Sequence, residues 1–223
     1  MARTFPTSSD FISEGSIGSI DVTGDNITIH AWVKPTQNGM IVNRFGSSGP
    51  TQQFFMQRTS NVLQVAISDG ASDVATGATT MTTGAWHSVG LRKADSGVSG
   101  VLEAWLDGVM DGSTASPTGA QGIGGAAGSR YVIGLRSSVS LSWGGAIAEV
   151  AVWLVTLTTA EMVALSKGAS PLKVRPADLY HYHPVWGGSP EIDLVNPSVT
   201  LNISGSPTVA NHAPVTPPFP LAA

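Results

Sequence analysis

His181 and His183 are separated by a single residue in the run LYHYH. Side chains two residues apart lie on the same face of an extended chain, so the two imidazoles are placed to share a ligand. A zinc site needs a third and usually a fourth ligand. Nothing nearby in the sequence supplies an obvious Asp/His set. The pair is therefore interpreted as polar tips beside buried Tyr180 and Tyr182, and no metal is expected.

Glu191 and Asp193, in the run EIDLVN, are the sharpest catalytic candidates. Retaining β-glucanases carry E-x-D-x-(x)-E on one strand, and retaining chemistry needs two carboxyl groups about 5–5.5 Å apart. Asn196 stands where the final acid of that pattern would be, and Pro197 follows it. An amide cannot donate a proton as a carboxylic acid can. We therefore expect no catalytic residue here.

Other reactive groups are scarce. The chain has no cysteine, which excludes disulfides, cysteine-ligated zinc and a thiol nucleophile. No Ser-His-Asp arrangement can be read from the spacing, and no G-x-S-x-G run is present. Three acidic residues are candidates for an oxygen-liganded calcium site: Asp25, Asp69 and Asp73. A turn-forming role is favoured for them, and no cofactor is expected.

Aromatic side chains offer a different chemistry, the stacking of a ligand. In residues 27–34 the apolar side chains share one parity, so His30 and Trp32 point to the opposite face. By the same alternation, Glu103 and Trp105 point away from the core in residues 101–106. If both strands belong to the concave sheet, these four residues line a groove that offers stacking and hydrogen bonds to a ligand. The alternative is that loops cover both indoles, since tryptophan is highly buried on average.

The elements that position these residues are mostly short strands. Gly, Asn and Asp clusters separate the apolar runs, a pattern typical of a sandwich or barrel. Strands are predicted near residues 3–6, 10–13, 27–34, 40–45, 52–58, 62–68, 86–93, 101–106, 130–135, 146–154, 179–183 and 199–203. The Gly-rich stretch 113–129 is predicted to be a loop. One short helix is predicted near 159–167, with Thr158 and Glu161 as a capping box and Gly168 at its end.

The charge and the apolar content of the chain restrict the kinds of partner it can bind. The net charge of −4 leaves no basic surface for nucleic acid, and no apolar run approaches the roughly 20 residues of a membrane-spanning helix. The start MARTFPTSSD lacks the apolar segment of a secretory signal. Either the chain is made in the cytoplasm of the producing cell without a signal, which is the expectation, or a signal segment has been replaced. Only 12% of residues are charged, against about 25% in ordinary domains. Surface contacts with neighbouring subunits and a simple β-rich composition explain this equally well.

Six segments in order resemble the laminin-G-like, concanavalin A-like jelly-roll family. They are residues 2–15, 26–36, 52–70, 131–138 and 144–162, with W-H-x-V-x-L and L-x-x-W-L-D-G in 86–108. The resemblance implies an all-β antiparallel sandwich forming one domain over 1–210, followed by a Pro-rich arm at 211–223. Residues 178–209 resemble the segment that precedes the first strand in the family, as in a circular permutation. The stretch 135–143, which matches the calcium loop of pentraxin-like relatives, contains no carboxylate.

This permuted form is similar to tailed-bacteriophage virion proteins. The first functional hypothesis is therefore a non-enzymatic virion component, a capsid decoration or other surface protein that also adheres to glycans. Its expected partners are the major capsid protein or neighbouring subunits, further copies of itself and cell-surface glycans, and its location is the virion. The second hypothesis is a stand-alone carbohydrate-binding lectin module. The third and least favoured is a glycoside hydrolase.

Overall fold

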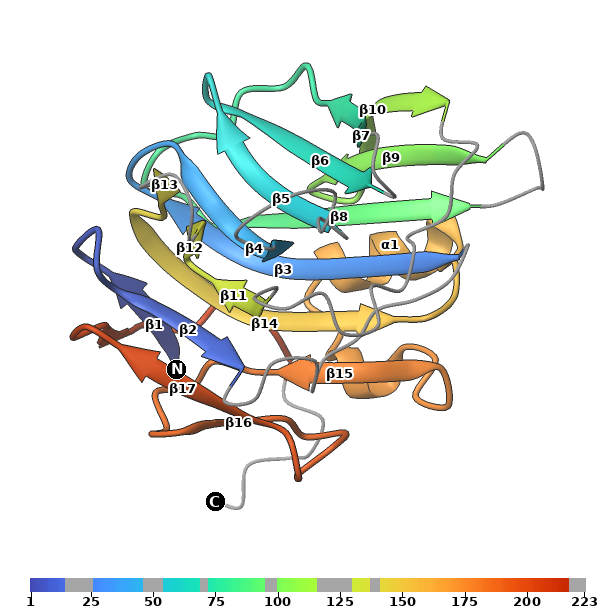
Figure 1. Cartoon of the computed structure of the whole chain (residues 1–223). Coiled ribbons are helices and arrows are strands. Elements are labelled where there is room, and N and C mark those ends of the chain that lie inside the picture. Colours follow the sequence, from blue (N-terminus) through green and yellow to red (C-terminus); the bar gives the residue numbers. More distant parts are fainter. Residues whose placement is uncertain are drawn as a thin grey trace.

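Two antiparallel β-sheets face each other across a hydrophobic core (Figure 1). The computed structural model describes residues 1–14, 26–45, 54–68, 72–94, 100–115, 130–136 and 141–216. The prediction of an all-β sandwich with one short helix is confirmed.

The first sheet is centred on β14, which pairs with three other strands. Its order is β10 (Val109–Ala115), β9 (Val101–Leu106), β8 (His87–Ala94), β3 (Ile27–Pro35), β14 (Gly145–Trp153), β1 (Ala2–Phe5) and β18 (Thr208–Ala210). β15 (Leu179–His183) also pairs with β14. One edge of β14 is therefore shared, with β1 along its first half and β15 along its second.

The second sheet brings the N-terminal and C-terminal segments together. Its order is β16 (Glu191–Ile192), β17 (Thr200–Ser204), β2 (Phe11–Glu14), β11 (Arg130–Ile133), β4 (Gly39–Phe45), β5 (Phe54–Thr59), β6 (Val62–Ser68) and β7 (Ser72–Thr76). β12 (Leu135–Arg136) and β13 (Leu141–Ser142) form a separate pair. The circular permutation and the domain boundaries inferred from the sequence stay predictions.

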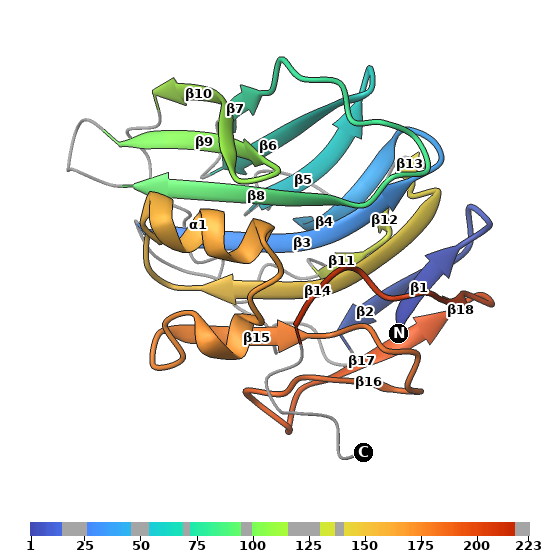
Figure 2. The ribbon, with the colours of Figure 1, turned by 180° about the vertical axis from the view of Figure 1, so that it is seen from behind.

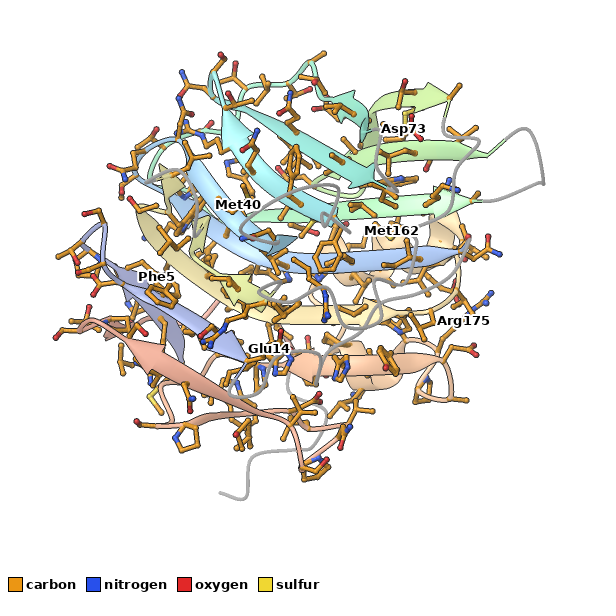
Figure 3. All side chains as sticks on the ribbon, in the orientation of Figure 1. Phe5, Glu14, Met40, Asp73, Met162 and Arg175 are labelled. Carbon is orange, nitrogen blue, oxygen red and sulfur yellow. The ribbon has the colours of Figure 1, made fainter. Side chains whose placement is uncertain are left out.

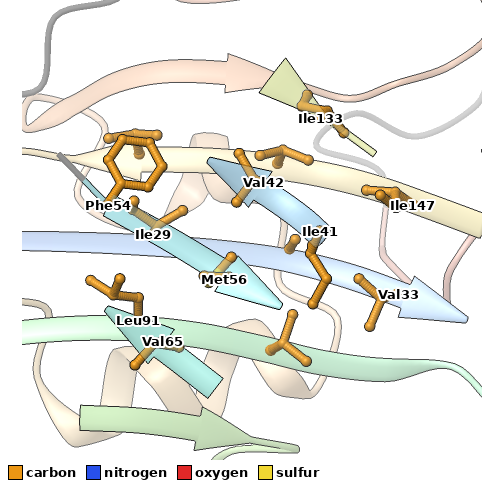
Figure 4. Close-up of a cluster of buried hydrophobic side chains, with 14 of the residues drawn as sticks. Ile29, Val33, Ile41, Val42, Phe54, Met56, Val65, Leu91, Ile133 and Ile147 are labelled. Atoms are coloured by element: carbon orange, nitrogen blue, oxygen red, sulfur yellow. The ribbon is translucent and has the colours of Figure 1, made fainter. Parts of the chain in front are cut away.

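The core follows from strand alternation. Because successive side chains point to opposite faces, every second residue of the central strands enters the space between the sheets. Figure 4 labels ten residues of this core: Ile29, Val33, Ile41, Val42, Phe54, Met56, Val65, Leu91, Ile133 and Ile147. Ile41 and Val42 are consecutive, because a register shift in β4 interrupts the alternation there. Leu102, Ala104 and Leu106 of β9 also join this core, as the parity of that strand predicts.

The helix α1 (Thr159–Ser166) crosses the outer face of the first sheet (Figure 2). Its predicted capping box is confirmed, with Thr158 and Glu161 bonding to each other's backbone. Gly168 follows at φ +87°, a conformation that favours glycine and ends the helix. A 3-10 turn, η1 (Pro171–Lys173), leads on to β15. Among the described residues, no helix combines the length and the apolar character needed to cross a bilayer.

Among the described residues, five strands escaped prediction: β7, β10, β13, β16 and β18. All are edge strands or next to an edge, so they carry little apolar alternation. The expected loop at 113–129 is wrong for its first three residues, which continue β10 in register with β9; residues 116–129 lie outside the described part of the chain. Asp73 lies on β7 (Figure 3), whereas Asp25 and Asp69 fall outside the described residues.

Candidate functional site

The four side chains predicted to bind a ligand lie on one sheet and one face. β3 and β9 flank β8, and His30 is in register with Gly90, which is in register with Trp105. A Cβ at Gly90 would stand 2.6 Å from Met162 Cε of α1. Because Gly90 has no side chain, α1 can pack closely against the sheet at β8, between the two strands predicted to bind a ligand.

The side chain of Trp105 is buried and does not lie on the surface of the protein. It is 4% exposed and belongs to the cluster beneath α1. Its Nε1 donates to Glu103 Oε2 at 2.7 Å. Arg92 donates to both oxygens of Glu103 at 2.6 and 3.0 Å, and its guanidinium lies 4.7 Å from the Trp105 ring centre. A third Arg92 bond, to Leu157 O, ties this cluster to the start of the helix.

Trp32 is covered by the end of the chain. It is 5% exposed and packs with Ala146, Ala148 and Ala213, with Val215 against the same cluster. His30 is buried beside it, with Nε2 at 2.9 Å from the Ser88 hydroxyl.

The parity prediction for these four residues therefore holds, but they do not form an open groove. α1 covers Trp105, and the C-terminal segment, which is neither helix nor strand over residues 211–216, covers Trp32 as the alternative of a covering loop predicts. A ligand-binding role for His30, Trp32, Glu103 and Trp105 stays a prediction.

We call residues 211–216 the C-terminal strap; they are the described part of the predicted arm. Figure 2 shows the chain beyond β18 crossing β14 on the outer face. Thr216 N donates to Gly168 O at 2.7 Å, and His212 Nε2 lies 2.8 Å from Glu149 Oε1. Glu149 sits in a bulge of β14 at φ +57° and also accepts from the Tyr182 hydroxyl. The strap is thus fastened at both the strand and the helix end.

Glu191 and Asp193 are both buried and both serve as hydrogen-bond acceptors. Glu191 accepts from the Arg3 guanidinium and from Gly187 N. Asp193 accepts from His181 Nδ1, and its other oxygen accepts from Asn196 N at 3.1 Å. Neither carboxylate faces solvent, so this pair does not present the arrangement that retaining hydrolysis needs.

The interpretation of His181 and His183 as polar tips is wrong. Both imidazoles are buried, and Asp193 lies beside them as a third metal-ligating group. Burial lowers the pKa of His183 to about 4, so its ring is neutral. Burial by itself would raise the pKa of Asp193, but hydrogen bonds from His181 and the backbone hold it below its usual value. The sequence does not reveal that Asp193 lies beside the two histidines, because the chain turns back between β15 and Asp193.

Trp186 is a surface residue that the sequence reasoning missed. The residue is 41% exposed, more than any other tryptophan among the described residues. The segment that carries it is held firmly: Arg3 donates to Gly188 O, and Gly187 N donates to Glu191 Oε1 at 2.8 Å. Val185 adopts φ +58°, which β-branched residues rarely do. The available signal was an indole directly before Gly-Gly, where a turn leaves little to cover it.

A family model described as the concanavalin A-like lectin/glucanases superfamily matches residues 10–163. The resemblance to this family inferred from the six segments is confirmed, whereas the similarity to phage virion proteins stays a prediction. No curated protein matches the sequence.

Solved structures agree on the fold. A protein from Bacteroides ovatus proposed to bind carbohydrate is 17% identical with a TM-score of 0.71, covering 96% of this chain and 61% of that one. This chain therefore spans less than two thirds of that protein's length. A heptameric SAP-like pentraxin from Limulus polyphemus is 16% identical with a TM-score of 0.59, covering 91% and 94%. The CBM40 of the Ruminococcus gnavus IT-sialidase, bound to α2,3-sialyllactose, is 15% identical with a TM-score of 0.52, covering 64% and 83%.

Proposed function

Because the chain belongs to the concanavalin A-like lectin/glucanase superfamily, we propose that it is a non-enzymatic carbohydrate-binding domain. Two of the structures that share its fold are named for carbohydrate binding, one of them with a sialylated sugar bound. The buried, hydrogen-bonded state of Glu191 and Asp193 supports the absence of glycoside hydrolysis. The carbohydrate-binding module is thus preferred to the hydrolase and to a purely structural role.

The exposed indole of Trp186 is the observation that carries this proposal. An indole has a large flat apolar face with few rotatable bonds, so it offers contact area at little entropic cost. The Arg3 and Glu191 bonds fix the segment that bears it, and a fixed platform avoids the cost of ordering a loop on binding. Val209, itself exposed, packs against the same segment at Gly187. Trp186 is therefore the proposed stacking surface for a sugar ring.

A glycan array followed by titration of each positive glycan tests the proposal. Trp186→Ala is expected to weaken binding at least tenfold, about 1.4 kcal/mol, because the stacking face is lost. Met110→Ala is the matched control, since Met110 is equally exposed but lies on β10, at the opposite edge of the first sheet. Its affinity should equal that of the wild type.

The outcomes separate the possible sites. If Trp186→Ala binds as tightly as the wild type while a folded Trp32→Phe or Trp105→Phe variant does not, the site lies at the four residues predicted from the sequence. If no glycan binds the wild type at all, the carbohydrate-binding function is wrong.

A surface component of a tailed-phage virion, made in the host cytoplasm, is the second candidate. The low charged fraction and the shared fold with a heptameric pentraxin favour an assembly of several copies. Co-sedimentation with assembled capsids, together with light scattering of the free chain, tests this role. A strictly monomeric protein that does not sediment with capsids would contradict it.

A further inference from the structure

The cluster of His181, His183 and Asp193 lies inside the sandwich. In the pairing of β15 with β14, His183 is opposite Val150. His181 is likewise opposite Val152, and both valines belong to the main core. The two imidazoles therefore enter the space between the sheets from one strand, with near-parallel rings whose centres are 5.9 Å apart.

The backbone fixes the carboxylate beside this strand. Leu194 N donates to Tyr182 O at 2.9 Å, which fastens the segment after β16 to β15. Oδ1 of Asp193 then accepts three backbone N–H groups, those of Tyr182 at 3.1 Å, Val195 at 2.8 Å and Asn196 at 3.1 Å. The position of Asp193 thus follows from the fold of its own segment, and Oδ2 is left to face the histidines.

Both histidines present an unused lone pair. His181 Nδ1 bonds to Asp193 Oδ2, and His183 Nδ1 lies 3.4 Å from Ile192 O. Since a carbonyl or carboxylate oxygen only accepts, each Nδ1 carries a hydrogen, and in the neutral form of each ring Nε2 then carries a lone pair. Within the described part of the chain, neither Nε2 has a hydrogen-bond partner, although both are buried. Buried polar atoms are normally paired, so two such atoms side by side indicate a missing ligand.

One ligand atom from each of the three residues lies within 4.8 Å of the other two, and His183 Nε2 is 4.0 Å from Asp193 Oδ2. Two imidazole nitrogens with one carboxylate oxygen are a donor set that suits Zn²⁺ and Co²⁺. We propose that His181, His183 and Asp193 bind a single divalent transition-metal ion between the two sheets.

The role of such an ion is structural. All three side chains are buried. Such a site would take up its metal ion as the chain folds, so that metal binding stabilises the folded state. The ion joins β15 of the first sheet to the segment that follows β16 of the second. Neighbouring Tyr131 comes from β11 of the second sheet, with its ring 5.6 Å from that of His183. Its hydroxyl is also buried and has no hydrogen-bond partner among the residues that the structure describes.

Metal binding by the full chain tests the proposal. The protein is dialysed against a chelator, then loaded with Zn²⁺ or Co²⁺ and dialysed again. We expect one retained ion per chain, visible absorption bands in the Co²⁺ form, and a melting temperature that rises with metal concentration. If no ion is retained and the melting temperature does not move, the cluster holds no metal and the proposal is wrong.

Substitutions locate the ion. His181→Gln and His183→Gln are each expected to weaken binding at least tenfold, whereas His212→Gln, at the strap, should leave it unchanged. Unchanged binding in both of the first two variants would overturn the assignment. If those variants fail to fold, X-ray absorption of the loaded wild type decides: scattering from two imidazoles supports the site, and a shell without imidazole refutes it.

Discussion

At the scale of single residues, burial decides the chemistry of the histidines. Burial lowers the pKa of His30 to about 3, because the charged form loses its hydration. His87 behaves in the opposite way: the hydrogen bond to Asp107 raises its pKa, despite partial burial. The two histidines therefore make opposite contributions to the pH dependence of stability.

The contribution of His30 to the free energy of unfolding should fall as the pH drops from about 6.5 to about 3. In that window His30 is protonated in the unfolded chain but not in the folded chain. This difference of one proton lowers the free energy of unfolding by roughly 1.4 kcal/mol per pH unit. His30→Gln keeps a polar partner for Ser88 but cannot titrate. Urea unfolding across this range should give a shallower slope for the variant. An identical slope would show that His30 is protonated in the folded protein.

The His87–Asp107 pair should stabilise the fold below about pH 6.5 and lose that effect as the pH rises through the raised pKa. Asp107→Asn removes the charge but retains an acceptor for Ser88 N and a residue tolerant of φ +51°. The melting temperature of the variant should fall further below that of wild type at acidic pH than at alkaline pH. Equal differences at both pH values would contradict this account.

At the scale of elements, the junction between α1 and the strap is the most constrained. A Cβ at Gly168 would collide with Pro214 O, whereas one at Gly84 would meet nothing within 4 Å. Both glycines have a positive φ, +87° for Gly168 and +80° for Gly84. An alanine at either position would therefore carry the same backbone strain. Gly84→Ala should cost about 1 kcal/mol.

Gly168→Ala should cost more than Gly84→Ala, because it also displaces the strap. Hydrogen exchange at residues 211–216 should speed up in the Gly168 variant alone. Equal costs in the two variants, with unchanged exchange, would show that the strap adapts to the added methyl group.

The sequence could predict the elements whose burial is periodic. Strand parity placed Leu102 and Leu106 in the core, and the spacing of Thr158 and Glu161 located the helix start. Parity could not reveal what covers a face. Trp32 is buried by Ala213 from the far end of the chain, and Asp193 reaches His181 only because a turn folds one segment back onto the other. Such contacts depend on the whole topology.

At the scale of the whole molecule, the strap closes the outer face of the first sheet. A chain ending at residue 210 should expose Trp32 and the alanines around it, lose stability and bind apolar dyes. A chain ending at residue 216 keeps the strap and is the matched control. Thermal melting and light scattering of both check this. If the shorter chain is as stable as the longer one, the strap contributes no packing energy.

The pairing of β1 with β18 has a mechanical consequence. The strands are antiparallel, with Ala2 opposite Ala210, so both ends of the ladder that lead outward lie at the same corner. Tension applied between Met1 and Asn211 would load the backbone bonds one pair at a time, as in unzipping, instead of shearing them together. The first obstacle to that tear is Arg3, whose guanidinium holds Pro207 O and Glu191 at once. Arg3, one residue in from the corner, therefore adds a side-chain link to the resistance of the backbone pairs.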